Sequence, residues 1–315
     1  MLTDLIFNNQ PAMTKFPSNA QFKPGHGVAS VKTYRYLRLG MLLAVVALGW
    51  AMVEERNQPR VHCFLGSIST YYYTPVHPVF IGVLVALGVA LIVIKGRTAI
   101  EDAFLTIAGV LAPIVAFVPT SNDPNTSCAK KMAGVGRYQT SGDAHLANAS
   151  ISNDLHAYLF AGTLAVILFL GIALVQRFYR TAKVPNAADE CTRGTWWSLI
   201  GAAGLVLVGW LFLTLGFSWV LKGHGIAAAG MIAFLAFAAL ANGFMSQHTT
   251  PRYARSYLAV GGAMIGSGLI FLVIYKGIDQ NALGGELVLA IEAVEIALFG
   301  AFWALQTVER WNQTV

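Results

Sequence analysis

The chain has 315 residues, of which 56% are hydrophobic and only 11% are charged, with a formal net charge of +6. Soluble globular domains carry about 25% charged residues, so this composition excludes an ordinary soluble domain and indicates a protein embedded in a lipid bilayer. The basic residues lie between apolar runs, where membrane topology accounts for them, so nucleic acid is not an expected partner.

Eight apolar segments each approach the length of about 20 residues that a helix needs to cross the hydrocarbon layer. In chain order they are 36–53, 77–95, 104–120, 155–176, 196–217, 226–245, 257–275 and 287–308. They predict an all-α fold, a polytopic transmembrane helix bundle of about eight spans. We expect a polar cytoplasmic tail at 1–35 and a single transmembrane domain at 36–310, with a longer outer loop at about 121–154.

The distribution of basic residues predicts the orientation. When the N-terminus is placed in the cytoplasm, most of the 21 lysines and arginines fall in inner segments. Cytoplasmic loops of membrane proteins are enriched in these residues, so both termini are expected inside, and the plasma membrane is the expected location.

Two of the three cysteines, Cys63 and Cys128, fall in outer loops under this orientation. An oxidising exterior permits a disulfide between them, and two free thiols are the alternative. The outer loop also carries glycosylation sequons at Asn125 and Asn148, which matter only in a host that glycosylates secreted proteins.

The second span is preceded by an unusually polar and aromatic stretch, SISTYYYTPVHP. Tyr71, Tyr72, Tyr73 and His77 are typical of a membrane interface, so anchoring in the headgroup region explains much of this stretch. Anchoring does not require three consecutive tyrosines with Ser69 before them, and the alternative is the mouth of a ligand site.

The last span carries three acids, Glu286 at its outer boundary and Glu292 and Glu295 deeper, on one helical face. An acid in mid-membrane costs about 2.5–3.5 kcal/mol even on the insertion scale, so these side chains must be protonated, hydrogen-bonded or close to water or a cation. Neutral polar residues are their candidate partners: Tyr158, Thr163, Thr214, Ser267 and the tyrosines before the second span. The acids favour a proton, cation or ligand site, and a structural glutamate is the alternative.

Five of the seven histidines fall at outer positions. His77 and His156 open the second and fourth spans and are candidate metal ligands, because neutral imidazole commonly binds metal ions. The competing interpretation is that histidine is simply common at wet interfaces. The sequence leaves the identity of any cofactor unknown.

Ser69, Tyr71 to Tyr73 and His77 at one helix start, with Asp102 at the next, resemble the superfamily of alkaline ceramidases and progestin-type receptors. The resemblance implies an intramembrane metal-dependent lipid hydrolase that uses serine, aspartate and three histidines around zinc. The chain departs from that family in its last helix, which has Glu292 and Glu295 in place of two histidines, and Asp102 is expected on the side opposite His77.

Three functions therefore remain open from the sequence. The first is a non-catalytic sensor, lipid-binding scaffold or complex subunit with a polar outer pocket for a lipid or small molecule. That pocket would combine Ser67, Ser69, Tyr71, Tyr72, Tyr73, His77, His156, Glu286 and Glu292. The second is a proton-coupled transporter that uses Glu292 and Glu295, and the third is the metal-dependent hydrolase.

Overall fold

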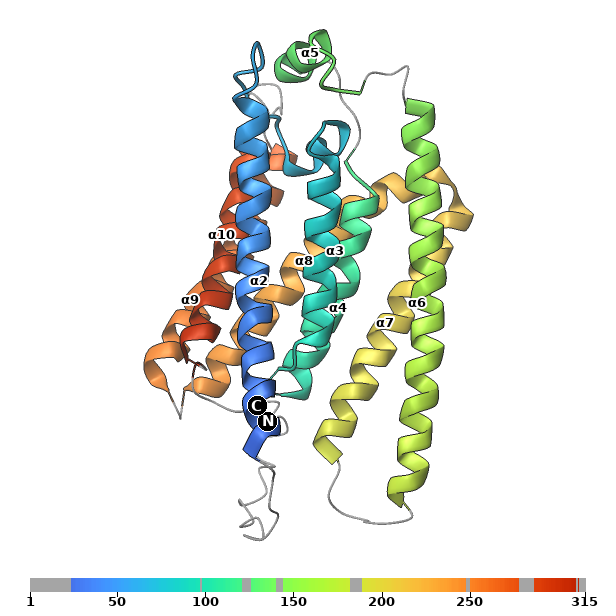
Figure 1. Ribbon diagram of the computed structural model, residues 1–315, viewed down its shortest axis with the longest axis vertical. Helices are drawn as coiled ribbons and strands as arrows, with labels where there is room; N and C mark the ends of the chain where they lie inside the picture. The colour runs from blue at the N-terminus through green and yellow to red at the C-terminus, as the bar shows by residue number, and fades with distance from the viewer. Residues whose placement is uncertain are drawn as a thin grey trace.

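The computed structural model describes residues 24–96, 98–120, 126–139, 144–181, 189–247, 250–277, 286–309 and 311. Within these ranges the chain forms helices and no strand. Eight long helices make a bundle (Figure 1): α2 (Pro24–Arg56), α3 (His77–Val93), α4 (Ala99–Phe117), α6 (Ala144–Thr181), α7 (Asp189–Leu215), α8 (Phe217–Ser246), α9 (Pro251–Gly277) and α10 (Glu286–Glu309). Two short helices, η1 (Ile68–Tyr73) and α5 (Ser127–Gly134), lie at the upper end of the view in Figure 1.

Seven of the described helices are long and apolar enough to cross a membrane, and α3 is a shorter apolar helix. The all-α membrane bundle expected from the sequence is thus confirmed, whereas the span count of eight stays a prediction. α2 begins at Pro24, well before residue 36, where the first span was expected to start. Of the two sequons, Asn125 lies outside the described residues and Asn148 is exposed on α6.

α4 occupies the centre of the bundle, where it packs against α3, α7 and α8. In its most apolar stretch 61% of the residues are buried. The corresponding share is 6% in α6 and in α7, so these two helices are peripheral. They lie side by side on one flank in Figure 1. α10 packs between α2 and α9. Together with α3, α4 and α8, these three helices form the closely packed part of the bundle.

The close contact between α3 and α4 depends on two glycines that face each other. A Cβ atom on Gly88 would lie 2.7 Å from the carbonyl oxygen of Gly109, and a Cβ atom on Gly109 would lie 2.7 Å from that of Gly88. Both distances are too short for carbon and oxygen, so only glycine allows this approach. Small residues serve the same purpose in membrane helix pairs generally, because they bring the two backbones together.

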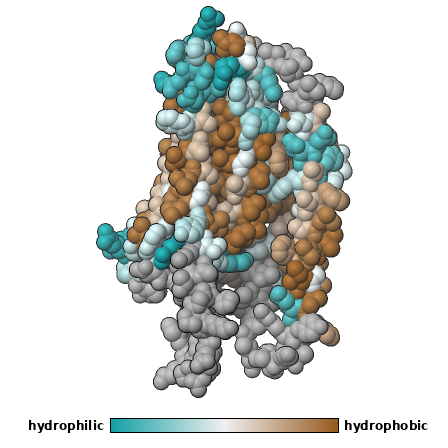
Figure 2. Space-filling view, viewed as in Figure 1, coloured by the Kyte–Doolittle hydropathy of each residue, from teal (hydrophilic) through white to brown (hydrophobic). Residues whose placement is uncertain are grey.

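The outer surface of the bundle is apolar over its middle part. Figure 2 shows a hydrophobic band below a hydrophilic upper end. On α6 and α7, large side chains such as Ile167 and Leu207 are 61% and 70% exposed. Exposing so large an apolar area to water is unfavourable, so these faces imply a lipid bilayer as the environment.

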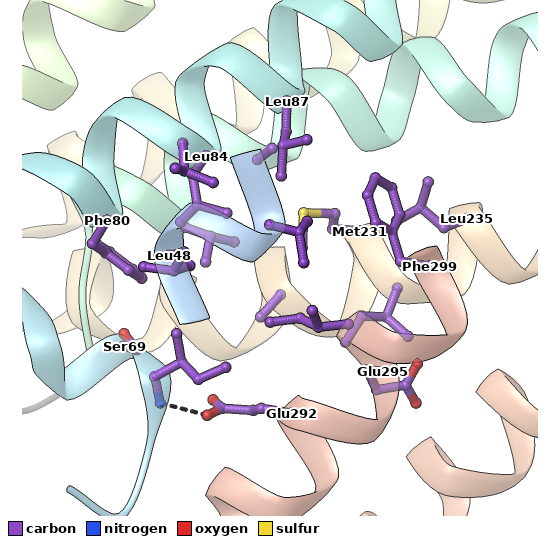
Figure 3. A pocket seen from close by; sticks show the side chains of 18 of the residues that line it. Leu48, Ser69, Phe80, Leu84, Leu87, Met231, Leu235, Glu292, Glu295 and Phe299 are labelled. Atoms are coloured by element: carbon purple, nitrogen blue, oxygen red, sulfur yellow. Dashed lines mark hydrogen bonds between the residues drawn. The ribbon is translucent and has the colours of Figure 1, made fainter. Parts of the chain in front are cut away.

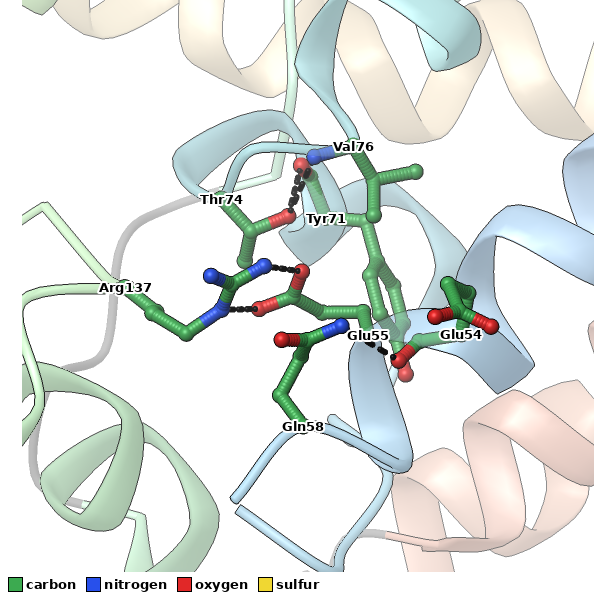
Figure 4. Close-up of polar contacts among 7 residues, drawn as sticks. All are labelled: Glu54, Glu55, Gln58, Tyr71, Thr74, Val76 and Arg137. Atoms are coloured by element: carbon green, nitrogen blue, oxygen red, sulfur yellow. Dashed lines mark hydrogen bonds and ion pairs between the residues drawn. The ribbon is translucent and has the colours of Figure 1, made fainter. Parts of the chain in front are cut away.

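A disulfide and an ion pair hold together the polar cap at the upper end of the bundle. The Cys63–Cys128 bridge expected from the sequence is present and joins the loop after α2 to α5. Beside it, the Arg137 guanidinium donates two hydrogen bonds to the Glu55 carboxylate at the end of α2, of 2.7 and 2.6 Å (Figure 4). These links fix the segments that cover the upper ends of α2 and α3.

Candidate functional site

The polar stretch before α3 folds into a short 3₁₀ helix, η1. Ser67 caps its start, and the Ser67 side chain accepts a hydrogen bond from the Ser69 backbone N–H. Thr74 ends it, since its backbone N–H and hydroxyl both donate to the Tyr71 carbonyl, as Figure 4 shows for the hydroxyl. α3 then begins with Pro78 in its first turn, where a missing N–H is harmless.

The three tyrosines of η1 all point into protein. Tyr71 and Tyr72 are 1% exposed and Tyr73 is 4% exposed. The Tyr73 hydroxyl donates to the Thr120 carbonyl at 2.9 Å, and the Tyr72 ring lies 4.1 Å from the His77 ring. Burial raises the pKa of Tyr71 to about 12, so its phenol stays neutral at physiological pH. The interpretation of these residues as headgroup anchors is therefore replaced by a packing role that holds η1 in place.

The side chain of Glu292 joins α10 to η1 through two hydrogen bonds. Its Oε1 accepts a hydrogen bond from the Ser67 hydroxyl at 2.8 Å, and its Oε2 accepts one from the Ile68 backbone N–H at 2.6 Å. One turn earlier, the Leu289 N–H donates to the Gly66 carbonyl at 2.9 Å. The first turns of α10 thus lie directly against the start of η1.

Glu295 lies one helical turn deeper than Glu292 and has a different partner. The Ser267 hydroxyl of α9 donates a hydrogen bond to its Oε1, and Ser267 was among the partners considered from the sequence. Glu295 is only 5% exposed, and its Oε2 has no hydrogen-bond partner among the described residues. In Figure 3 the two carboxyl groups of α10 point in opposite directions, with Glu292 turned toward η1.

A cavity of about 140 Å³ lies between these acids and helices α2, α3, α4, α8 and α9. Ser69 and Glu292 border its η1 end, Glu295 lies one turn further along α10, and the rest of the wall is mostly aliphatic and aromatic (Figure 3). The polar lining residues are Ser69, His224, Glu292 and Glu295, and the deeper lining includes Leu87, Leu91, Leu235 and Phe299. From Phe80 to Leu91 it follows α3 for about 16 Å at a rise of 1.5 Å per residue.

His224 also lines the cavity, although it is not among the site residues expected from the sequence. It belongs to α8 and its Nδ1 lies 2.5 Å from the Val118 carbonyl oxygen. A carbonyl accepts but cannot donate, so this ring nitrogen is assigned as the protonated one. The ring also interacts with the Val115 backbone carbonyl, so both of these partners are acceptors at the end of α4. In the sequence His224 falls in the short connection expected between the spans 196–217 and 226–245, which gave no indication that it borders the same space as α10.

Several of the expected site residues do not join the cavity. His156 is exposed on α6, where its Nδ1 lies 2.7 Å from the Ser152 carbonyl oxygen and its ring lies 6.0 Å from that of Trp210. His77 packs on Tyr72, and no group of three or more potential metal-binding side chains occurs among the described residues. Glu286 begins α10, but its side chain lies outside the described part.

Asp102 has a structural role at the other end of the bundle. It lies in the first turn of α4 and accepts hydrogen bonds from the Lys95 ammonium at 3.0 Å and the Gly96 N–H at 2.8 Å. α3 separates this loop from Ser69 and His77, in agreement with the expectation that Asp102 and His77 lie on opposite sides. Asp102 therefore holds the connection between α3 and α4 together.

Comparison with known proteins adds no relative: no protein-family model, no curated protein and no solved structure matches this chain. The class of protein follows from the fold and surface alone. The long apolar helices and their lipid-facing side chains define a multi-pass α-helical membrane protein. Its distinguishing feature is a largely apolar cavity between the helices, whose wall includes the two glutamates of α10.

Proposed function

We propose that this protein is a non-catalytic membrane protein, a sensor or lipid-binding scaffold, that binds a single-chain amphiphile in the cavity between α3, α8 and α10. The observation that carries the proposal is the polarity of the cavity. Ser69 and Glu292 border the cavity beside η1, Glu295 lies one turn deeper, and the remaining wall is almost wholly apolar. The same proposal places both termini in the cytoplasm and the η1 end of the bundle outside.

The size and lining of the cavity support an apolar chain as its occupant. An engineered cavity of about 150 Å³ lined by leucine, isoleucine and phenylalanine stays dry and binds benzene. The cavity here has a similar volume of about 140 Å³ but is elongated along α3. A linear alkyl chain suits that shape, and Leu87, Leu91 and Phe299 would surround its end. A segment about as large as benzene fills this volume, and the rest of a longer chain extends through the open side of the cavity.

The outer wall supports a polar head on the same ligand. Glu292 and Ser69 border the cavity at η1, where a head group can form hydrogen bonds while the chain stays in apolar surroundings. The hydrogen bonds from Ser67 and the Ile68 N–H hold the Glu292 carboxylate in one position. A pre-positioned acceptor of this kind favours binding because little side-chain freedom is lost.

Filling the cavity should abolish binding. We expect Ala228→Phe, on the cavity wall of α8, to weaken binding of tritium-labelled dodecanol to protein in nanodiscs by at least about tenfold. Each buried methylene contributes about 0.8 kcal/mol, so excluding two of them accounts for that loss. Equilibrium binding, corrected for uptake by empty nanodiscs, is the measurement.

Val208→Phe is the matched control, because Val208 lies on α7 and is 48% exposed on the lipid-facing side. It should bind dodecanol as the unchanged protein does. Met231→Trp fills the same cavity from another position, so it provides a second test if Ala228→Phe does not fold. Equal binding by the unchanged protein and both folded cavity variants would refute the proposal.

A further inference from the structure

We infer that the head group of the ligand is a cation, a protonated primary amine carried on a single apolar chain. This inference rests on the proposed function and specifies the class of ligand that the same cavity binds. Three features of the described residues carry it: the charge of the cavity wall, the free acceptor positions on that wall, and the buried Glu295 oxygen without a partner.

The charge of the wall is one-sided. Glu292 and Glu295 both border the cavity, and no lysine or arginine is among the described residues that line it. Their hydrogen-bond donors, Ser67, Ser267 and a backbone N–H, are all neutral. A carboxylate buried in apolar surroundings is costly unless a cation accompanies it. A cationic head group supplies that charge, whereas an anionic head would add repulsion.

The geometry leaves acceptors for an ammonium group. A carboxylate has about four acceptor positions, and Glu292 uses one on each oxygen. An ammonium carries three donors and no acceptor, so it matches a wall made of acceptors.

Glu295 adds a second negative group one turn deeper, about 4.5 Å along the axis of α10. Its side chain is buried, it borders the cavity, and its Oε2 has no partner among the described residues. A buried polar atom without a hydrogen bond is uncommon in proteins and calls for a specific explanation. A nearby cation provides one: the head group contacts Glu292, and its charge also stabilises the more distant Glu295 carboxyl, which is turned toward α9.

The test compares three ligands that share one chain: tritium-labelled dodecylamine, dodecanol and dodecanoate, in zwitterionic nanodiscs at neutral pH. We expect the unchanged protein to bind dodecylamine at least about tenfold more tightly than dodecanol, because charge-assisted hydrogen bonds are the stronger ones. Dodecanoate should bind most weakly. In Glu292→Gln the ratio of amine to alcohol affinity should fall close to one, and Glu295→Gln should lower it as well.

Glu54→Gln is the control, since Glu54 is an exposed acid at the end of α2 and does not line the cavity. Its amine-to-alcohol ratio should equal that of the unchanged protein. Dodecanol or dodecanoate binding as tightly as dodecylamine would overturn the inference and leave the amphiphile site intact. If none of the three ligands binds the unchanged protein, the proposed function fails and the inference fails with it.

Discussion

Replacing Arg137 by methionine is expected to lower the free energy of unfolding by about 3 kcal/mol, because it leaves a carboxylate buried without its cation. Glu55 is 3% exposed and receives two hydrogen bonds from the Arg137 guanidinium, which is 31% exposed. The pair joins the end of α2 to the segment after α5, beside η1 (Figure 4). Thermal unfolding of the purified protein in one detergent measures the loss.

Two further variants separate the ion pair from a general effect of charge removal. Lys131→Met removes an exposed cation from the same part of the chain and should change stability little. The double variant Arg137→Met with Glu55→Gln should recover much of the loss, since it removes the uncompensated charge. A double variant no more stable than Arg137→Met alone would show that the buried charge is not the cause.

Introducing a side chain at Gly88 is the second change with a large expected effect. A Cβ atom there would lie 2.7 Å from the Gly109 carbonyl oxygen and 2.9 Å from the Pro113 ring, both on α4. We expect Gly88→Val to destabilise the protein by about 1–3 kcal/mol, because α3 and α4 must move apart. Dodecanol binding should weaken as well, since Leu87 and Leu91 on α3 line the cavity.

Gly82 provides a control on the same helix, because a Cβ atom there would meet nothing within 4 Å. Alanine has the higher helix propensity, so Gly82→Ala should leave stability unchanged or raise it slightly. Gly88→Ala should lower it. The two alanine variants therefore differ in the sign of their effect on the unfolding temperature, and equal shifts would contradict the assignment of Gly88 as a close-packing position.

Much of the fold could be predicted from hydrophobicity, because each helix that enters lipid must satisfy its own backbone and carry an apolar run. The third span, predicted at 104–120, corresponds to α4, which extends it back to Ala99. The disulfide was predicted because Cys63 and Cys128 fall on one side of the membrane map. Ser267 was a candidate partner for the acids because few neutral polar residues lie within the spans.

The site was less accessible to sequence reasoning because it depends on how the helices pack. The cavity is formed by aliphatic residues that any membrane helix carries, and nothing in Leu87 or Leu235 marks them as its wall. One of the two hydrogen bonds to Glu292 comes from the backbone N–H of Ile68, to which no side-chain pattern points. The tyrosines looked like interface anchors because composition does not show that η1 turns them inward.

The most direct test of the amphiphile site is to locate the bound chain. Dodecanol with a diazirine at the end of its chain would be bound, activated by light and mapped by peptide mass spectrometry. We expect adducts at the deeper cavity wall, on Leu87, Met231 or Phe299, that excess unlabelled dodecanol suppresses and that Ala228→Phe lacks. Adducts confined to lipid-facing positions such as Val208, unaffected by competitor or by Ala228→Phe, would contradict the proposal that the cavity binds an amphiphile.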